Sequence, residues 1–268
     1  MTLPRLVATD LDGTLLAPDG LLSARTAAAL QAVAAAGVVV VFATGRPPMV
    51  AGREVAAAGT GVHYGVMANG SIVCTLPEGD VLHTLRFPAQ VAVDAVRSLR
   101  VHDAALGFAL ATDAGFTAEP GFHERMPIRS GDATVPDALV GHDTATDAVK
   151  LIAFHPHVGA HDLMRSLPQV LGPDLTVNHM GADAVEIAPA GADKGVGLAW
   201  LCRHLDIRPD DVMVFGDEVN DLPMFQVARH RVAVANANPL VREAADEVTA
   251  SNADDGVALV LERLLADS

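Results

Sequence analysis

The chain has 268 residues, half of them apolar, and a formal net charge of −15. The apolar share supplies a sizeable core and excludes a disordered chain, while the acidic balance disfavours nucleic acid and anionic membranes as partners. The start carries no secretory signal pattern, and no apolar run reaches the roughly 20 residues that cross a bilayer. We therefore expect a cytoplasmic protein whose two cysteines, Cys74 and Cys202, are reduced and buried.

The first 70 residues alternate strand and helix patterns. Ser23 is a suitable N-cap for an alanine-rich helix that ends before Gly37, and four consecutive valines at 38–41 indicate a fully buried strand. The expected order is strand 6–9, helix 24–36, strand 38–43, a helix to about residue 58, and strand 65–68. Such strand–helix alternation predicts right-handed crossovers and a parallel sheet.

The pattern returns near the C-terminus, with strands expected at 185–188, 212–215, 231–234 and 247–249 and helices at 195–205, 222–228, 239–245 and 256–266. The middle mixes helix candidates at 89–99 and 160–167 with strand-like runs at 107–112, 149–154 and 175–178. We predict an α/β protein with a Rossmann-like core, residues 1–82 and 185–268, into which an α+β domain, residues 83–184, is inserted.

Polar side chains follow several predicted strands. Asp10 and Asp12 follow the first strand, Thr44 the second and Asn69 the third, and Asp217 follows a late one. Ligands of open parallel sheets collect beyond the carboxyl ends of the strands, and a carboxylate next to a buried strand is costly to desolvate unless it is paired or metal-bound. These strand ends therefore predict one shared site.

Each motif has a chemical use. In the Asp-Leu-Asp-Gly-Thr-Leu-Leu stretch at 10–16, Gly13 lets the backbone turn toward a phosphate. The acidic run at 216–221 offers hard oxygen ligands, which select Mg²⁺ over Zn²⁺. Thr44-Gly45-Arg46 opens a helix that could receive a phosphate, and Lys194 could bring positive charge to the same face. Taken singly, these two features are weak signals, because a threonine is often an ordinary helix cap and a lysine in a first helical turn is usually solvated.

In combination and order, these motifs resemble the haloacid-dehalogenase superfamily, specifically its Cof-like, type IIB sugar-phosphatase group. The matching stretches are residues 10–16, 44–46, 69–70, 193–195 and 216–221 and the closing run at 251–258. Glu218 departs from the residue types common in that group, and we expect its carboxylate to face solvent. The resemblance implies a Rossmann-like core with a cap inserted after the third strand.

The resemblance also implies roles for the residues. Asp10 would attack phosphorus and form an aspartyl-phosphate, and Asp12 would protonate the leaving oxygen and then activate water. The transferring phosphoryl group would contact Thr44, Gly45, Arg46, Asn69, Lys194 and Asn220. Mg²⁺ would be bound by Asp10, the backbone carbonyl of Asp12, Asp217 and, directly or as support, Asp221.

The implied function is a Mg²⁺-dependent phosphatase acting on small phosphorylated metabolites, such as a sugar phosphate or a similar monoester. A phosphomutase of the same superfamily and a catalytically silent metabolite-binding protein are the alternatives. The cap would contact the leaving group, with candidates at 123–125 and 178–180. We expect a monomer or a weak homo-oligomer.

Overall fold

The structure is a computed structural model that describes residues 3–46, 59–112, 116–119, 147–182 and 184–267. By its internal contacts the chain divides into two units. Residues 1–83 and 193–268 form the first, here called the core unit, and residues 84–192 form the second, the inserted unit. Within the described ranges, no helix combines the length and apolar character needed to span a bilayer.

The core unit is built on an eight-stranded sheet in the order β13-β12-β11-β1-β2-β3-β4-β5. Neighbouring strands from β13 to β3 pair in parallel, and β4 pairs antiparallel with β3. The strands are β1 Leu6–Thr9, β2 Val39–Ala43, β3 Tyr64–Met67, β4 Ile72–Thr75, β5 Val81–Thr84, β11 Val212–Gly216, β12 His230–Ala233 and β13 Glu247–Val248. The predicted parallel α/β core is confirmed. Beyond β3 the sheet continues with β4, an antiparallel strand that the sequence patterns did not predict.

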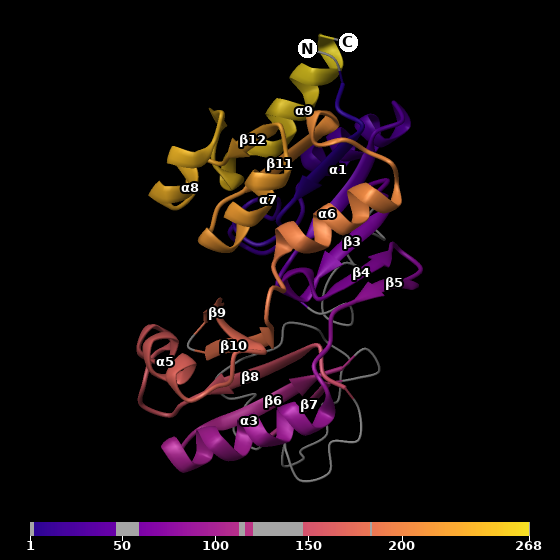
Figure 1. Cartoon of the computed structure of the whole chain (residues 1–268). Coiled ribbons are helices and arrows are strands. Elements are labelled where there is room, and N and C mark those ends of the chain that lie inside the picture. The colour runs from indigo at the N-terminus through magenta and orange to yellow at the C-terminus, as the bar shows by residue number, and fades with distance from the viewer. Residues whose placement is uncertain (1–2, 47–58, 113–115, 120–146, 183, 268) are drawn as a thin grey trace. The chain divides into compact units, whose positions relative to one another are not determined.

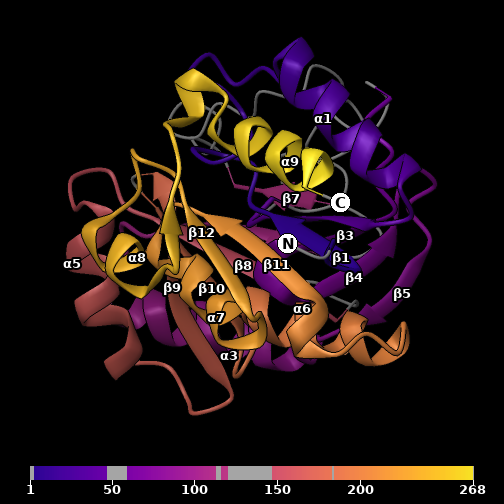
Figure 2. The same cartoon turned by 90° about the horizontal axis from the view of Figure 1, so that it is seen from above.

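Helices cover both faces of this sheet (Figures 1 and 2). They are α1 Ala24–Ala35, α6 Lys194–His204, α7 Leu222–Val227, α8 Pro239–Ala244 and α9 Gly256–Ala266. Helices α1 and α9 pack together on one face, and α6 packs with α7 on the other. All four residues of β1 are buried, as expected for a central strand covered on both faces.

The start of α1 was predicted from the sequence. The side chain of Ser23 accepts a hydrogen bond from the N–H of Thr26 and caps the helix.

Two further predictions have different outcomes. The helix predicted to run to about residue 58 lies outside the described residues. Both cysteines are buried and free, which agrees with the prediction.

The inserted unit contains a five-stranded antiparallel sheet in the order β7-β6-β8-β10-β9. Its elements are α3 Ala89–His102, β6 Gly107–Ala111, β7 Phe116–Ala118, β8 Lys150–Phe154, α5 Ala160–Ser166, β9 Leu175–Ala182 and β10 Ala184–Pro189. Leu99 of α3 and Leu163 of α5 join Leu151 and Ile187 in one buried apolar cluster. The strand expected at 185–188 lies in this sheet as β10, so the contact boundary at 192/193 falls eight residues beyond the expected one.

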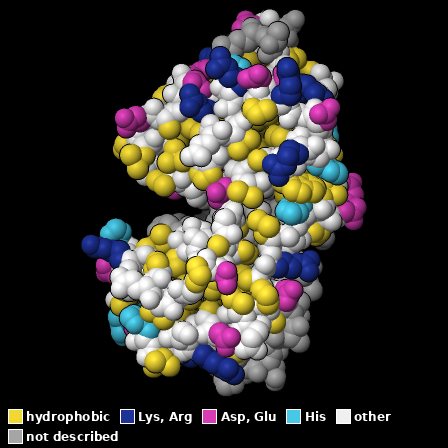
Figure 3. Space-filling model, in the orientation of Figure 1, with side chains coloured by type: hydrophobic (Ala, Val, Ile, Leu, Met, Phe, Trp, Pro, Cys, Tyr) yellow, Lys and Arg dark blue, Asp and Glu magenta, His cyan; other side chains and the backbone are white. Residues whose placement is uncertain are grey.

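On the face shown in Figure 3, the described Lys and Arg side chains lie singly or in small groups between apolar and acidic ones. They form no continuous basic patch within this described part of the surface.

Candidate active site

The site is assembled where three neighbouring strands of the core unit end. β1 lies between β2 and β11 and pairs in parallel with both, with Thr9 opposite Phe42 on one side and Phe215 on the other. Asp10, Thr44 and Asp217 therefore leave the sheet at the same edge, each within two residues of its strand's last paired position. Adjacent parallel strands thus bring together groups up to 207 positions apart in the chain.

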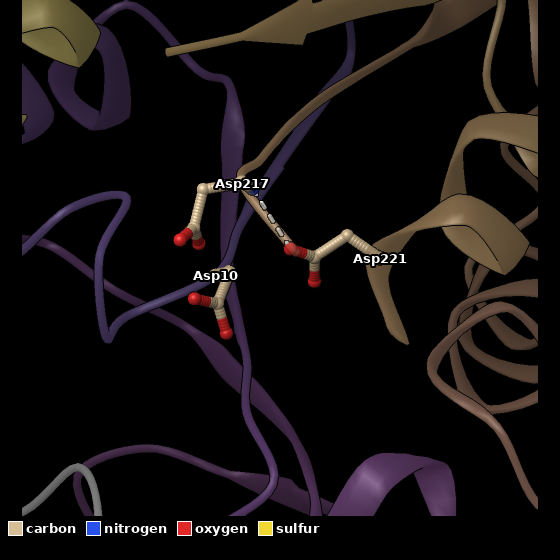
Figure 4. Close-up of side chains that lie close together, drawn as sticks. All are labelled: Asp10, Asp217 and Asp221. Atoms are coloured by element: carbon tan, nitrogen blue, oxygen red, sulfur yellow. Dashed lines mark hydrogen bonds between the residues drawn. The ribbon is translucent and has the colours of Figure 1, made fainter. Parts of the chain in front are cut away.

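Three carboxylates meet at this edge (Figure 4). Asp10, Asp217 and Asp221 each offer an oxygen, and these oxygens all lie within 4.8 Å of one another. Asp10 is 5% exposed and Asp221 is fully buried. The carboxylates of Asp10 and Asp217 point into the same space, whereas one oxygen of Asp221 turns toward the backbone at Asp217. A buried group of like charges requires compensating positive charge.

Lys194 supplies part of that charge. Its Nζ lies 2.5 Å from Oδ1 of Asp10 and 2.6 Å from Oδ1 of Asp221, and its side chain is 1% exposed. The lysine is the first residue of α6, and Asp193 caps that helix by accepting a hydrogen bond of 2.7 Å from the N–H of Val196.

A glycine fixes where α6 begins. Gly70, in the turn after β3, has φ +89°, and a Cβ on it would lie 1.8 Å from the carbonyl oxygen of Asp193. Only glycine permits this approach. The turn after β3 therefore packs directly against the residue that precedes Lys194.

The acidic loop after β11 is held by its own last residue. Oδ2 of Asp221 accepts hydrogen bonds from the backbone N–H groups of Asp217 and Glu218, at 2.9 and 3.0 Å. With its other oxygen on Lys194, Asp221 uses both oxygens inside the protein. Glu218 is exposed and accepts from the N–H of Val219, which fits the solvent-facing side chain expected for it.

Asp217 is anchored by the loop that follows β1, residues 10–16. Its Oδ1 accepts a hydrogen bond of 2.7 Å from the hydroxyl of Thr14. Gly13 has φ +86°, and a Cβ there would lie 2.3 Å from Oδ2 of the same carboxylate. The turn at Gly13 therefore packs against Asp217, and a larger residue would displace that side chain.

Burial and neighbouring charges shift the pKa values of Asp10, Asp217 and Lys194, in part in opposite directions. Burial raises the pKa of Asp10 well above its ordinary value, and Lys194 opposes that rise. Burial, assisted by the charges of Asp221 and Glu218, raises the pKa of Asp217 to about 6, while Thr14 and Lys194 act against it. Burial alone would lower the pKa of Lys194, but Asp10 and Asp221 outweigh it and the pKa is raised. The lysine is therefore charged at neutral pH.

The donor set fits a divalent cation. Three carboxylates and one ammonium leave two formal negative charges when all are ionised, and every open acceptor is a hard oxygen of the type Mg²⁺ prefers. Asp10 and Asp217 are the side chains aimed into the common space, while Asp221 is occupied by Lys194 and two backbone donors.

The side chain of Asp12 lies apart from this group. Both of its oxygens are bound by Arg46, with Nε at 2.7 Å from Oδ2 and Nη2 on Oδ1. Asp12 is also the most exposed of the site aspartates, with 54% of its side chain accessible. The N–H of Arg46 donates to the buried hydroxyl of Thr44 at 3.1 Å. The Asp12 carboxylate is thus held by a guanidinium and is not one of the three clustered carboxylates.

Two amides complete the neighbourhood. Asn69 is buried with φ 49°, and its Oδ1 accepts a hydrogen bond of 3.2 Å from Nδ2 of Asn220. Gly45 packs against the same Asn69 side chain, since a Cβ on Gly45 would lie 3.3 Å from it. Asn220, expected to contact the phosphoryl group, donates to Asn69 in the part of the chain that the structure describes.

The structure thus brings Asp10, Lys194, Asp217 and Asp221 into direct contact or close proximity and leaves the Asp12 side chain on Arg46. Of the cap candidates, residues 123–125 lie outside the described residues, and Asn178 lies in β9. Thr14 was given no role from the sequence, although it lies inside the most specific motif and a hydroxyl facing an acidic loop is a reasonable donor.

The core unit thus combines a mainly parallel sheet with three clustered aspartates and a buried lysine at the carboxyl ends of its strands. Residues 7–261 match the family model of the haloacid dehalogenase-like hydrolases, and the chain belongs to that family. This confirms the family predicted from the motifs.

The relatives cover nearly the whole chain. An HMP-PP phosphatase of Yersinia pestis (strain Pestoides F) is 30% identical over 253 residues, which is 89% of this chain and 86% of the relative. The crystal structure of TM0651 from Thermotoga maritima is similar with a TM-score of 0.83 and 27% identity, covering 97% of each chain. The structure of the subclass IIB sugar phosphatase BT4131 gives a TM-score of 0.83 at 20% identity, with 97% and 98% covered, and shows the shared fold.

Proposed function

We propose that this enzyme is a Mg²⁺-dependent phosphatase that hydrolyses small phosphorylated metabolites through an aspartyl-phosphate on Asp10. The phosphatase class is that of the family and its relatives. The Mg²⁺ dependence and the aspartyl-phosphate are proposed from the position of Asp10. It is buried at a strand end, with Lys194 on one oxygen and Asp217 close by. A carboxylate placed this way is a nucleophile whose charge is partly neutralised before a phosphate arrives.

Each residue has a role in this proposal. Asp10 attacks phosphorus as the bond to the leaving oxygen breaks, and Lys194 binds the oxygens of the transferring group together with Thr44. Asp12 leaves Arg46, takes up a proton from solvent and gives it to the leaving oxygen. In the second step it takes a proton from the water that attacks the aspartyl-phosphate. Arg46, Gly45 and the Asn69–Asn220 pair line the phosphate position.

Asp10, Asp217 and the backbone carbonyl of Asp12 would hold Mg²⁺, with Asp221 as support for the loop and the lysine. When bound, the ion supplies charge neutralisation to the phosphoryl oxygens. Without such compensation, the carboxylates of this edge would repel a phosphate dianion.

The substrate is proposed as a phosphorylated small molecule with a hydroxyl leaving group. Two of the three similar proteins named above are, by their printed names, an HMP-PP phosphatase and a sugar phosphatase. HMP-PP and a sugar phosphate therefore belong in a first substrate panel. We assign the inserted unit the role of recognising the leaving group.

The test uses p-nitrophenyl phosphate and the substrate panel with the full chain, in Mg²⁺ and in EDTA, beside Asp10→Asn. Asp246→Asn is the matched control, because Asp246 pairs with Arg231 at the opposite, amino end of β12. We expect activity that requires Mg²⁺, persists in the control and is lost in Asp10→Asn. Activity retained by Asp10→Asn would remove this residue from its role.

A further inference from the structure

The segment that follows β12 connects the two loops of the site. The N–H of Asn238 donates to the carbonyl of Asp217 at 2.8 Å. Two residues earlier, Nδ2 of Asn236 donates to the carbonyl of Gly13 at 2.7 Å. One short segment therefore bonds both to the loop that carries Asp217 and to the loop that carries Asp10.

The second of these bonds acts on a particular peptide group. The carbonyl of Gly13 and the N–H of Thr14 belong to one planar unit, so a bond to that carbonyl fixes the plane. Gly13 packs against the Asp217 carboxylate, and Thr14 donates to its Oδ1 at 2.7 Å. Asn236 thus holds the peptide whose two flanking residues set the direction of Asp217.

The orientation of the Asn236 amide is itself fixed. Its Oδ1 accepts a hydrogen bond of 3.0 Å from the N–H of Asn252. A backbone N–H requires an acceptor and the Gly13 carbonyl requires a donor, so only one orientation of the amide satisfies both. The side chain of Asn252 extends the connection by donating to the carbonyl of Leu16 at 2.7 Å.

We propose that Asn236 is a positioning residue for the metal site, acting through the Gly13–Thr14 peptide on the carboxylate of Asp217. The inference rests on the proposed Mg²⁺ site and adds a residue that touches neither the metal nor the substrate. Outer hydrogen-bond partners of metal ligands typically change metal affinity by about 10- to 100-fold. Since Asn236 is exposed, we expect an effect at the lower end, about tenfold.

The experiment measures Mg²⁺ binding to the full chain by isothermal titration calorimetry, without substrate. Asn236→Ala should weaken binding about tenfold while the metal-free melting temperature stays close to that of the wild type. Gln90→Ala is the matched control, because it removes another exposed amide hydrogen bond, Nε2 to Oδ1 of Asp94, in the inserted unit. The control should bind Mg²⁺ as the wild type does.

A double-mutant cycle with Thr14→Val separates positioning from a general loss of rigidity. If Asn236 acts through Thr14, then Asn236→Ala should add little to the effect of Thr14→Val, because the connection is already broken. Unchanged Mg²⁺ affinity in Asn236→Ala, or two fully additive effects, would overturn the inference. A wild-type protein that binds no Mg²⁺ would instead overturn the proposed function, so the two failures are distinguishable.

Discussion

Replacing Lys194 by methionine tests the charge balance of the site most directly. The substitution keeps an unbranched side chain but removes the ammonium that lies 2.5 Å from Asp10 and 2.6 Å from Asp221. Removing one partner of a buried ion pair costs about 3–5 kcal/mol, because a buried charge is left uncompensated. For a unit of this size, such a loss lowers the melting temperature by about 6–20 °C.

Mg²⁺ should bind Lys194→Met more tightly than the wild type, although the metal-free variant is less stable. Without the lysine, the three carboxylates carry three formal negative charges when all are ionised, as Mg²⁺ favours. Mg²⁺ should therefore restore more stability to the variant than to the wild type. Thermal unfolding at pH 8, with EDTA and with Mg²⁺, measures both effects. Arg208→Met, which removes a solvent-exposed ion pair with Asp211, is the control and should change neither value. A metal-free shift below about 2 °C would refute the inference that Lys194 compensates these buried charges.

Three further outcomes are expected. The pKa of Asp217 is raised to about 6 from 3.8, so in the metal-free protein its contribution to stability is fully present below about pH 4 and is lost as the pH rises through 6. Between pH 4 and pH 8 in EDTA, the free energy of unfolding should fall less for Asp217→Asn than for the wild type. The difference should reach up to about 2 kcal/mol after solvent screening, and an identical pH dependence, measured by thermal unfolding, would contradict this. Gly70→Ala places a Cβ against the carbonyl of Asp193 and should cost at least about 3 kcal/mol by denaturant unfolding, whereas Gly37→Ala, at a similar φ of +87° but with open space around it, should cost only about 1–2. Arg46→Ala removes the guanidinium that binds both oxygens of Asp12 and that we place beside the phosphate. It should lower kcat/KM about 10- to 100-fold in steady-state assays, and an unchanged value would exclude Arg46 from substrate binding.

Local sequence patterns predicted the core well where a single element carries its own signal. The buried valine run became β2, and the helix expected at 256–266 has those bounds as α9, because continuous burial and a clear helical period leave little ambiguity. Strands β4 and β5, which extend the sheet beyond β3, were not predicted. The place of β4 depends on its antiparallel pairing with β3, which its own residues do not specify.

Some features of the site were likewise predictable from local motifs, and others were not. The motifs predicted one shared site. In the structure Asp10 and Asp217 lie close together because adjacent parallel strands end side by side, and Lys194 joins them because α6 begins beside the turn after β3. The motifs could not predict that the side chain of Asp12 rests on Arg46, since the choice between neighbouring rotamers and partners depends on three-dimensional distances. Nor could they reveal Asn236, whose partner Gly13 lies 223 positions away. Hydrogen bonds across such separations follow from topology and leave no periodic pattern in the sequence.

The start of α6 has a mechanical consequence for the site. The chain returns from the inserted unit at Asp193, so only one residue separates that covalent connection from the lysine of the site. Tension along the returning chain would reach Lys194 directly if nothing intervened. The cap on Val196 and the close contact with Gly70 clamp Asp193 from two sides. Asp193 is therefore held within the core unit from two sides, directly before the residue that carries the ammonium group.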